Sequence, residues 1–259
     1  LSGNIMKVGA SELYLLSDGT FKLDGGTLFG QVPKDLWGRL VKSDTRNRVM
    51  LGINIVLLKN GNKNILIDTG AGNKYTDVML DRYGLKGNKT QRKLRKLGLT
   101  TKDIDIVILT HLHFDHAGGL TKSNRNGPLI PTFPNARHLI QETAWQHAMN
   151  PNERSSASFL KDDFQVLGDL GLIDLIKGNH EVYRGINIVK TDGHSRGHQI
   201  VEMGNRTRKV VFLGDLVPTP YHLALPYISS LDQHPEITLK YKRYLLEQAE
   251  KEGWLILFS

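Results

Sequence analysis

The sequence predicts a mixed α+β protein that forms one domain over residues 1–259. Two observations point to this class: some apolar runs stand close together like the strands of hairpins, and others alternate with helical segments. The chain has 259 residues, of which 39% are hydrophobic and 23% are charged, so it can bury a substantial core. We find no repeat, low-complexity tract or linker in the sequence that would divide it.

The expected strands are apolar runs bounded by polar turns. They cover residues 12–16, 53–58, 64–67, 104–109, 186–190, 199–203, 209–213 and 254–258. Gly61 and Asn62 are typical of a hairpin turn between the second and third of these runs. An amphipathic helix is expected at 237–251, and Thr100 or Thr101 can cap a short helix earlier in the chain.

The composition excludes several classes of protein. Without cysteine there is no disulfide framework, thiolate metal site, cysteine nucleophile or iron–sulfur cluster. No apolar stretch reaches the ~18 residues of a membrane span, and residues 1–9 lack the apolar core of a secretory signal. We therefore expect a cytoplasmic protein that does not associate with a membrane. Met6 resembles a native start, so we interpret residues 1–5 as an addition.

The densest functional signal lies directly after the apolar run 104–109. There the sequence reads His-Leu-His-Phe-Asp-His, from His111 to His116. His111 and His113 share one face if the chain is extended, and Asp115 and His116 can be aimed at a neighbouring point where the chain curls. One segment can therefore serve two adjacent metal ions. Imidazole and carboxylate groups suit zinc, iron, cobalt or manganese.

This segment, with its leading strand and trailing Ala-Gly-Gly, resembles the metallo-β-lactamase superfamily. Three further motifs follow the order of that family: Gly193-His194-Ser195-Arg196-Gly197-His198, then Leu213-Gly214-Asp215, and the early strand that ends at Asp68. The resemblance implies a four-layer αββα sandwich, in which two sheets pack face to face with helices outside. The site is expected at one edge of that sandwich.

The resemblance also implies a ligand set for two divalent metal ions, with zinc expected first and manganese, iron or cobalt as alternatives. The first ion takes His111, His113 and His194, the second takes Asp115 and His116, and Asp215 bridges the two. Asp68 supports a ligand histidine from behind, and His198 supports its own turn. The last ligand of the family is a His after the final strand. Because the chain stops at Ser259, we expect that His to follow it.

Several segments resemble one branch of the superfamily, the N-acyl-homoserine lactonases and methyl parathion hydrolases. These segments are residues 110–120, 133–136 and 151–155. The resemblance implies a small-molecule substrate and a hydrolase that opens lactones of the quorum-quenching type, or cleaves related esters. A hydroxide bridging the two metals would attack the carbonyl carbon, and Asp115 would assist proton transfer.

The sequence also departs from this branch. The lactonases carry a Tyr three residues after the bridging Asp to bond the substrate carbonyl, and here that position is Pro218. Tyr221 or His222 could replace it from the same loop. Arg196 stands where Pro is common in the family.

Other functions stay open at this point. The formal net charge of +8 is compatible with a phosphodiesterase, a nuclease or an organophosphate hydrolase of the same fold. However, we interpret the basic segment 86–96 as a solvated helix face with Leu94 and Leu97 turned inward, so nucleic acid is not an expected partner. A glyoxalase II-like thioesterase needs a further C-terminal domain, and a non-catalytic metal-binding protein would be marked by the loss of metal ligands.

The sequence is also compatible with a homodimer. Trp145 and Phe164 are expected to pack rather than to line a pocket.

Overall fold

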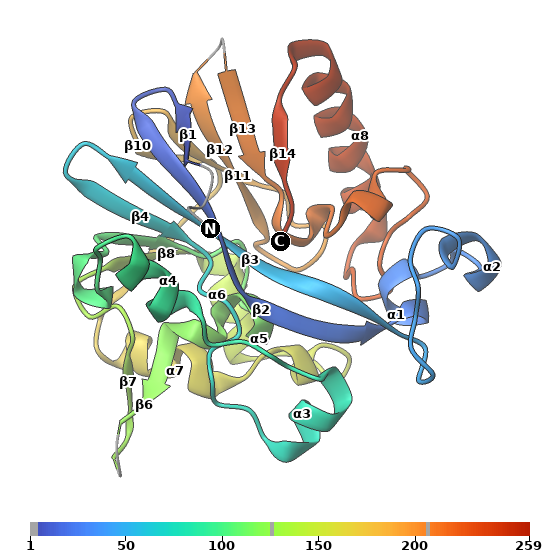
Figure 1. Cartoon of the computed structure of the whole chain (residues 1–259), viewed down its shortest axis with the longest axis horizontal. Coiled ribbons are helices and arrows are strands. Elements are labelled where there is room, and N and C mark those ends of the chain that lie inside the picture. Colours follow the sequence, from blue (N-terminus) through green and yellow to red (C-terminus); the bar gives the residue numbers. More distant parts are fainter. Residues whose placement is uncertain (1–4, 125–126, 206–207) are drawn as a thin grey trace.

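The computed structural model describes residues 5–124, 127–205 and 208–259, and two sheets dominate it (Figure 1). The larger sheet has seven strands in the order β1-β2-β3-β4-β5-β8-β9. Their bounds are Ile5–Val8, Ser11–Asp24, Arg48–Asn60, Lys63–Ile67, Ile106–Ile108, Arg137–Gln141 and Ile173–Ile176. Apart from Ile5, the expected addition 1–5 lies outside the described residues.

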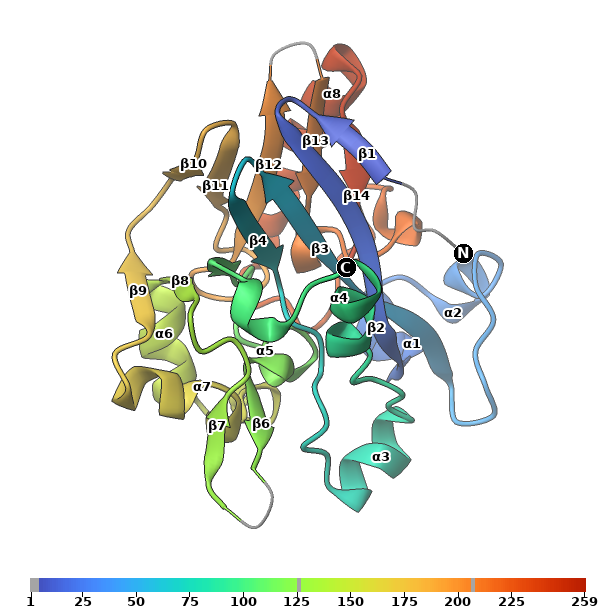
Figure 2. The same ribbon diagram turned by 60° about the vertical axis from the view of Figure 1, so that its left-hand side comes forward.

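The second sheet has five strands in the order β10-β11-β12-β13-β14. Their bounds are His180–Tyr183, Ile186–Lys190, Gln199–Asn205, Arg208–Phe212 and Leu255–Leu257. A separate hairpin pairs β6 (Thr121–Ser123) with β7 (Leu129–Pro131). Figure 2 shows this hairpin projecting from the body of the molecule.

Eight helices are described. They are α1 (Gly25–Phe29), α2 (Lys34–Trp37), α3 (Asp77–Tyr83), α4 (Thr90–Lys96), α5 (Phe114–Ala117), α6 (Glu142–Met149), α7 (Lys161–Asp169) and α8 (Pro235–Glu252). Those that cover the outer faces of the two sheets include α4, α6, α7 and α8. Short 3₁₀ turns occur at Thr101–Asp103, Gly118–Leu120, Ser156–Ser158, Gly214–Leu216 and Pro220–His222.

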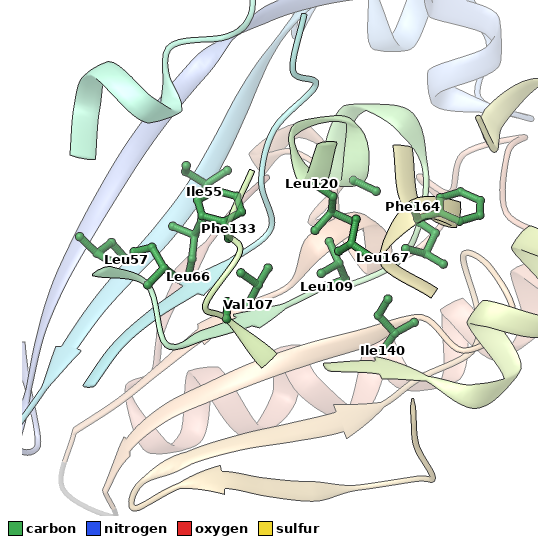
Figure 3. Close-up of a cluster of buried hydrophobic side chains, with 14 of the residues drawn as sticks. Ile55, Leu57, Leu66, Val107, Leu109, Leu120, Phe133, Ile140, Phe164 and Leu167 are labelled. Carbon is green, nitrogen blue, oxygen red and sulfur yellow. The ribbon is translucent and has the colours of Figure 1, made fainter. Parts of the chain in front are cut away.

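Alternation along the central strands sorts the core into layers. On β3, Ile55 and Leu57 face the layer of α4 to α7, where they join the cluster drawn in Figure 3. Their neighbours Val56 and Leu58 point the other way and pack against the second sheet. Beyond that sheet, Leu245 of α8 closes a third apolar layer. Period-two alternation with both faces apolar requires cover on both sides. The layers therefore run helix, sheet, sheet, helix, and the predicted αββα sandwich is confirmed.

Most of the predicted elements are confirmed. Each expected strand overlaps an observed one, the Gly61-Asn62 turn joins β3 to β4, and Thr100 caps the 3₁₀ turn that follows it. The basic segment contributes α4, with Leu94 buried as expected.

The predicted ranges were too short for β2 and β3, which pair from Ser11–Asn60 to Asp24–Arg48. Their far half forms a ribbon that extends beyond the sandwich and carries α1 and α2 (Figure 1). Among the described residues, no helix has the length and hydropathy to cross a membrane.

Candidate metal centre

The first residues of the site follow two neighbouring parallel strands. The strands β4 and β5 end together, so Asp68 after β4 and Thr110 after β5 lie side by side. The backbone N–H of Asp68 donates to the Ile108 carbonyl at 2.9 Å, and the Asp68 carboxylate accepts from the N–H of Thr110 at 2.8 Å. Asp68 adopts φ 58°, a left-handed conformation that costs energy for a residue with a side chain. In this conformation the carboxylate contacts Thr110 and, at 2.7 Å, His116 Nδ1.

The histidine segment changes from extended to helical conformation after His113. His113 is extended and precedes α5, so Asp115 and His116 lie in the first turn of a short helix. The extended part presents His111 and His113 to one place, and the helical turn presents the next pair to a second place beside it. This is the arrangement expected from the spacing.

The first group of side chains contains three histidines and one carboxylate. Nitrogen and oxygen atoms of His111, His113, His194 and Asp215 all lie within 4.8 Å of one another. His194 Nε2 is 3.1 Å from His113 Nδ1 and 3.4 Å from Asp215 Oδ2. His111 Nε2 is 3.9 Å from that same oxygen. His194 follows β11 and Asp215 follows β13, so the second sheet supplies half of the group.

The second group shares Asp215 with the first and adds Asp115 and His116. His116 Nε2 lies 3.2 Å from Asp215 Oδ1 and 3.5 Å from Asp115 Oδ2. On the other side of the ring, His116 Nδ1 is 2.7 Å from Asp68 Oδ2. A proton on Nδ1 leaves Nε2 as a lone pair facing the two carboxylates, which is the form of imidazole that binds metals.

The residues present fit divalent cations. His111 Nε2 is buried and has no hydrogen-bond partner among the described residues, although it points at the carboxylate of Asp215. An orphaned buried nitrogen costs free energy unless something else occupies its lone pair. Every donor is an imidazole or a carboxylate, the set that suits zinc and other first-row divalent ions.

Three further hydrogen-bond contacts orient the ligand-type side chains on the side away from the cluster. Asp232 Oδ1 lies 2.9 Å from His194 Nδ1, and its other oxygen accepts from the Thr238 hydroxyl at 2.6 Å. His198 Nε2 accepts from the backbone N–H of Asp215 at 3.1 Å, so this ring orients the carboxylate and is not free to bind a cation. No pattern in the sequence identified Asp232, because it stands in a loop far from His194 along the chain.

Burial and neighbouring charges set the protonation of the cluster. Burial holds the pKa of His111 and of His113 well below the usual range, so both rings are neutral. Burial acts in the same direction on His116, but the carboxylates of Asp215, Asp115 and Asp68 outweigh it and raise the pKa of that ring. Burial also raises the pKa of the Asp115 carboxyl. The concentrated negative charge beside a neutral imidazole pair favours a cation.

All of the cluster except His111 lines a cleft of about 360 Å³. Its walls come from the β2–β3 ribbon, from α3 and from the loop after β13. Apolar lining residues are Phe21, Leu23, Leu28, Leu51, Ile53, Tyr83, Phe114, Pro218 and Leu231. Ser259 also borders the cleft, and its hydroxyl donates to Asp215 Oδ1 at 3.0 Å.

Two predicted substrate residues lie elsewhere. Neither Tyr221 nor His222 lines the cleft. The His222 ring is buried and stacked on Phe29 with centroids 4.8 Å apart, and its nitrogens contact the Thr219 hydroxyl and the Leu28 carbonyl. Both nitrogens of the His222 ring are thus engaged within the protein, and the structure does not bring Tyr221 or His222 to the cleft that borders the metal cluster. Trp145 and Phe164 pack against each other outside the cleft, as expected.

Comparison with known proteins agrees with this geometry. Residues 49–259 match the Metallo-beta-lactamase superfamily. The N-acyl homoserine lactonase of Bacillus thuringiensis is 29% identical over 169 residues, which make up 64% of this chain and 59% of that protein. The chain thus spans less than two thirds of the length of that curated relative.

Solved structures extend the agreement over nearly the whole chain. A probable metal-dependent hydrolase from Staphylococcus aureus superposes with a TM-score of 0.91 at 31% identity, covering 98% of this chain and 90% of that one. An N-acyl homoserine lactone hydrolase, with the product N-hexanoyl-L-homoserine bound at its catalytic metal centre, gives a TM-score of 0.72 at 25% identity. That superposition covers 98% of this chain and 94% of the hydrolase. The family match includes every cluster residue, and so this chain belongs to the metallo-beta-lactamase superfamily.

Proposed function

We propose that this protein is a hydrolase with two divalent metal ions, most suited by zinc, that opens N-acyl homoserine lactones. The observation that carries the proposal is the pair of ligand groups that share Asp215 beside the apolar part of a cleft. His111, His113 and His194 would hold one ion, and Asp115 with His116 would hold the other. Apolar walls suit the acyl arm of such a substrate, which also agrees with the lactonases among the relatives.

The protein's own residues would position the ligands, transfer a proton and exclude water. When bound, two metal ions supply hydroxide at neutral pH and polarise the substrate carbonyl. Asp68 and Asp232 hold the rings of His116 and His194 in one tautomer. Asp115 borders the cleft and can take a proton and return it to the leaving alkoxide of the opened ring. Phe21, Ile53 and Phe114 exclude water from the acyl side.

The test is acid release from N-hexanoyl-homoserine lactone by the zinc-loaded protein. We expect kcat/KM above about 10⁴ M⁻¹s⁻¹, the lower end of typical enzyme efficiencies. His113→Ala and Asp215→Ala should abolish turnover and lower the metal content measured by elemental analysis. His180→Ala, an exposed histidine on β10, is the matched control and should change neither quantity.

Parallel assays with a phosphotriester, a phosphodiester and a glutathione thioester separate the alternatives. Faster cleavage of any of these than of the lactone would replace the lactonase proposal with that activity. Full activity of the His113→Ala protein would contradict the metal-dependent mechanism itself.

A further inference from the structure

The cleft is not apolar throughout, because its far end is lined by cations. Lys22, Arg46, Arg48 and Arg82 all border it. This end lies along the β2–β3 ribbon from the metal cluster. Asn54 of β3 donates to the carbonyl of Ser259 beside Asp215, and Arg48 is six residues further along the same strand, about 20 Å away at the rise of an extended chain.

Three of these four cations are already paired. Arg48 and Lys22 donate to Asp44 at 2.9 and 3.0 Å. Arg46 forms a forked pair with Asp81, at 2.9 Å to one carboxylate oxygen and 3.2 Å to the other. Each of the three thus has a carboxylate partner, although Lys22 and Arg48 share one.

Arg82 differs from the other three. Its side chain is exposed and makes no hydrogen bond or ion pair with the described part of the chain, while its backbone carbonyl accepts from Arg48 at 3.0 Å. Arg48 thus holds the backbone of the α3 turn that carries Arg82. The guanidinium of Arg82 itself has no such contact with the described residues. The backbone of this turn is therefore held, while the Arg82 side chain brings to the cleft a positive charge with no ion-pair partner in the described part of the chain.

Tyr83 stands next to it with a free hydroxyl. Its ring packs on Phe114 with centroids 5.1 Å apart, which anchors the side chain between the metal cluster and the cationic end. Within the described residues, the hydroxyl has no hydrogen-bond partner, although the side chain lines the cleft. Consecutive residues of a helix point in different directions, but Arg82 and Tyr83 both line this cleft, so a guanidinium and a phenol donor are available to an oxyanion bound in it.

We propose that the cleft selects substrates whose acyl arm ends in a carboxylate, with Arg82 as its counter-ion and the Tyr83 hydroxyl as a second donor. The inference rests on the proposed function, since it names the substrate class of the same site. The arm must cross the apolar strip of Phe21, Leu51 and Ile53 before it meets Arg82. A purely apolar pocket would favour a methyl end, so a preference for carboxylate is diagnostic.

The test compares two series of N-acyl homoserine lactones of increasing arm length, one ending in methyl and the other in carboxylate. The zinc-loaded protein is assayed for KM and kcat, and the ring-opened acyl homoserines are titrated calorimetrically, which measures binding without turnover. At the best arm length, we expect the carboxylate end to bind about fivefold more tightly than the methyl end, as for a well-placed exposed ion pair. The preference should shrink as salt is raised.

Variants of Arg82 and Tyr83 test whether these residues cause the preference for a carboxylate end. Arg82→Gln should bring the ratio of the two affinities to about one, and Arg82→Glu should favour methyl or amine ends. Both are expected to fold, since the side chain has no described contact to lose. Arg95→Gln is the matched control, because Arg95 is also an exposed arginine in the last turn of a short helix and lies outside the cleft. Tyr83→Phe should lower the preference in part while keeping the ring on Phe114.

The outcomes separate the two proposals. Turnover of both series without a carboxylate preference, or a preference that survives in Arg82→Gln, overturns the inference and leaves the lactonase proposal standing. Carboxylate-dependent binding without turnover of any lactone overturns the proposed reaction and supports the binding site. Absence of binding by every acyl homoserine overturns both.

Discussion

Asp232 shows how one residue outside the ligand set can control it. One carboxylate oxygen faces His194 Nδ1, and the other accepts from the Thr238 hydroxyl. The side chain is almost fully buried, so its two partners hold it in a single orientation. The proton on His194 must then sit on Nδ1, and Nε2 is left with its lone pair toward Asp215.

Replacing Asp232 should therefore weaken metal binding. Asp232→Asn keeps the size of the side chain but loses its charge, and we expect about a tenfold loss of zinc affinity, the lower end of such effects. Zinc competition against a chromophoric chelator measures it. Asp169→Asn, on an exposed aspartate of α7, should leave the affinity unchanged. Equal affinities of the Asp232→Asn and wild-type proteins would assign that carboxylate to loop structure alone.

At the same scale, sequence reasoning succeeded where the chemistry is local. His111 to His116 fall within one strand end and one helical turn, so their spacing alone indicated two neighbouring groups. Asp232 could not be found in this way, because only the packing of its loop against His194 brings it to the site. The place of the His222 ring could not be predicted either. Its position near Asp215 in sequence says nothing of the turn that buries its ring against Phe29.

At the scale of elements, the sequence indicated the parts of strands that lie in the core. Apolar alternation marks 53–58, where both faces of β3 are covered, but fades toward Arg48, where the ribbon leaves the sandwich. The extension depends on partners that pattern cannot show. Asp44 and Arg48 pair across the tip, and Arg46 reaches Asp81 at the end of α3. These contacts bring the ribbon and α3 together as walls of the cleft.

A second ionic contact between elements predicts a pH dependence of stability. Asp163 of α7 is buried beside Lys74, 3.1 Å away, and burial raises the pKa of its carboxyl to about 6 from 3.8. Between these two pH values the folded protein keeps a proton that the unfolded chain has lost. The free energy of unfolding should therefore fall as the pH rises from about 4 to about 6, and level off above.

Asp163→Asn should remove this contribution to the slope. Urea unfolding at several pH values, between 4 and 7, compares the variant with the wild type. Asp162→Asn, on the exposed neighbour in the same helical turn, serves as the control and should keep the wild-type slope. A wild-type slope in Asp163→Asn would mean that another carboxyl produces it.

At the scale of the whole molecule, the candidate metal centre joins the two halves of the sandwich. His111, His113 and His116 follow a strand of the seven-stranded sheet, whereas His194 and Asp215 follow strands of the five-stranded sheet. The two sheets also meet through apolar packing of side chains such as Val56 and Phe212, and through hydrogen bonds of Gln199. Bound cations would add polar links at one edge of that interface, where carboxylates and imidazoles of both sheets face each other.

Metal removal should therefore lower the stability of the entire fold. Ligands that bind only the folded state stabilise it by about 4 kcal/mol when present at a thousand times their dissociation constant. We expect a chelator to lower the melting temperature of the zinc-loaded protein, and added zinc to restore it. In His111→Ala the response should be much smaller, because this ring supplies a buried nitrogen that has no hydrogen-bond partner in the described part of the chain. His180→Ala should respond as the wild type does. A melting temperature indifferent to chelator would show that the cluster holds no metal in the folded protein.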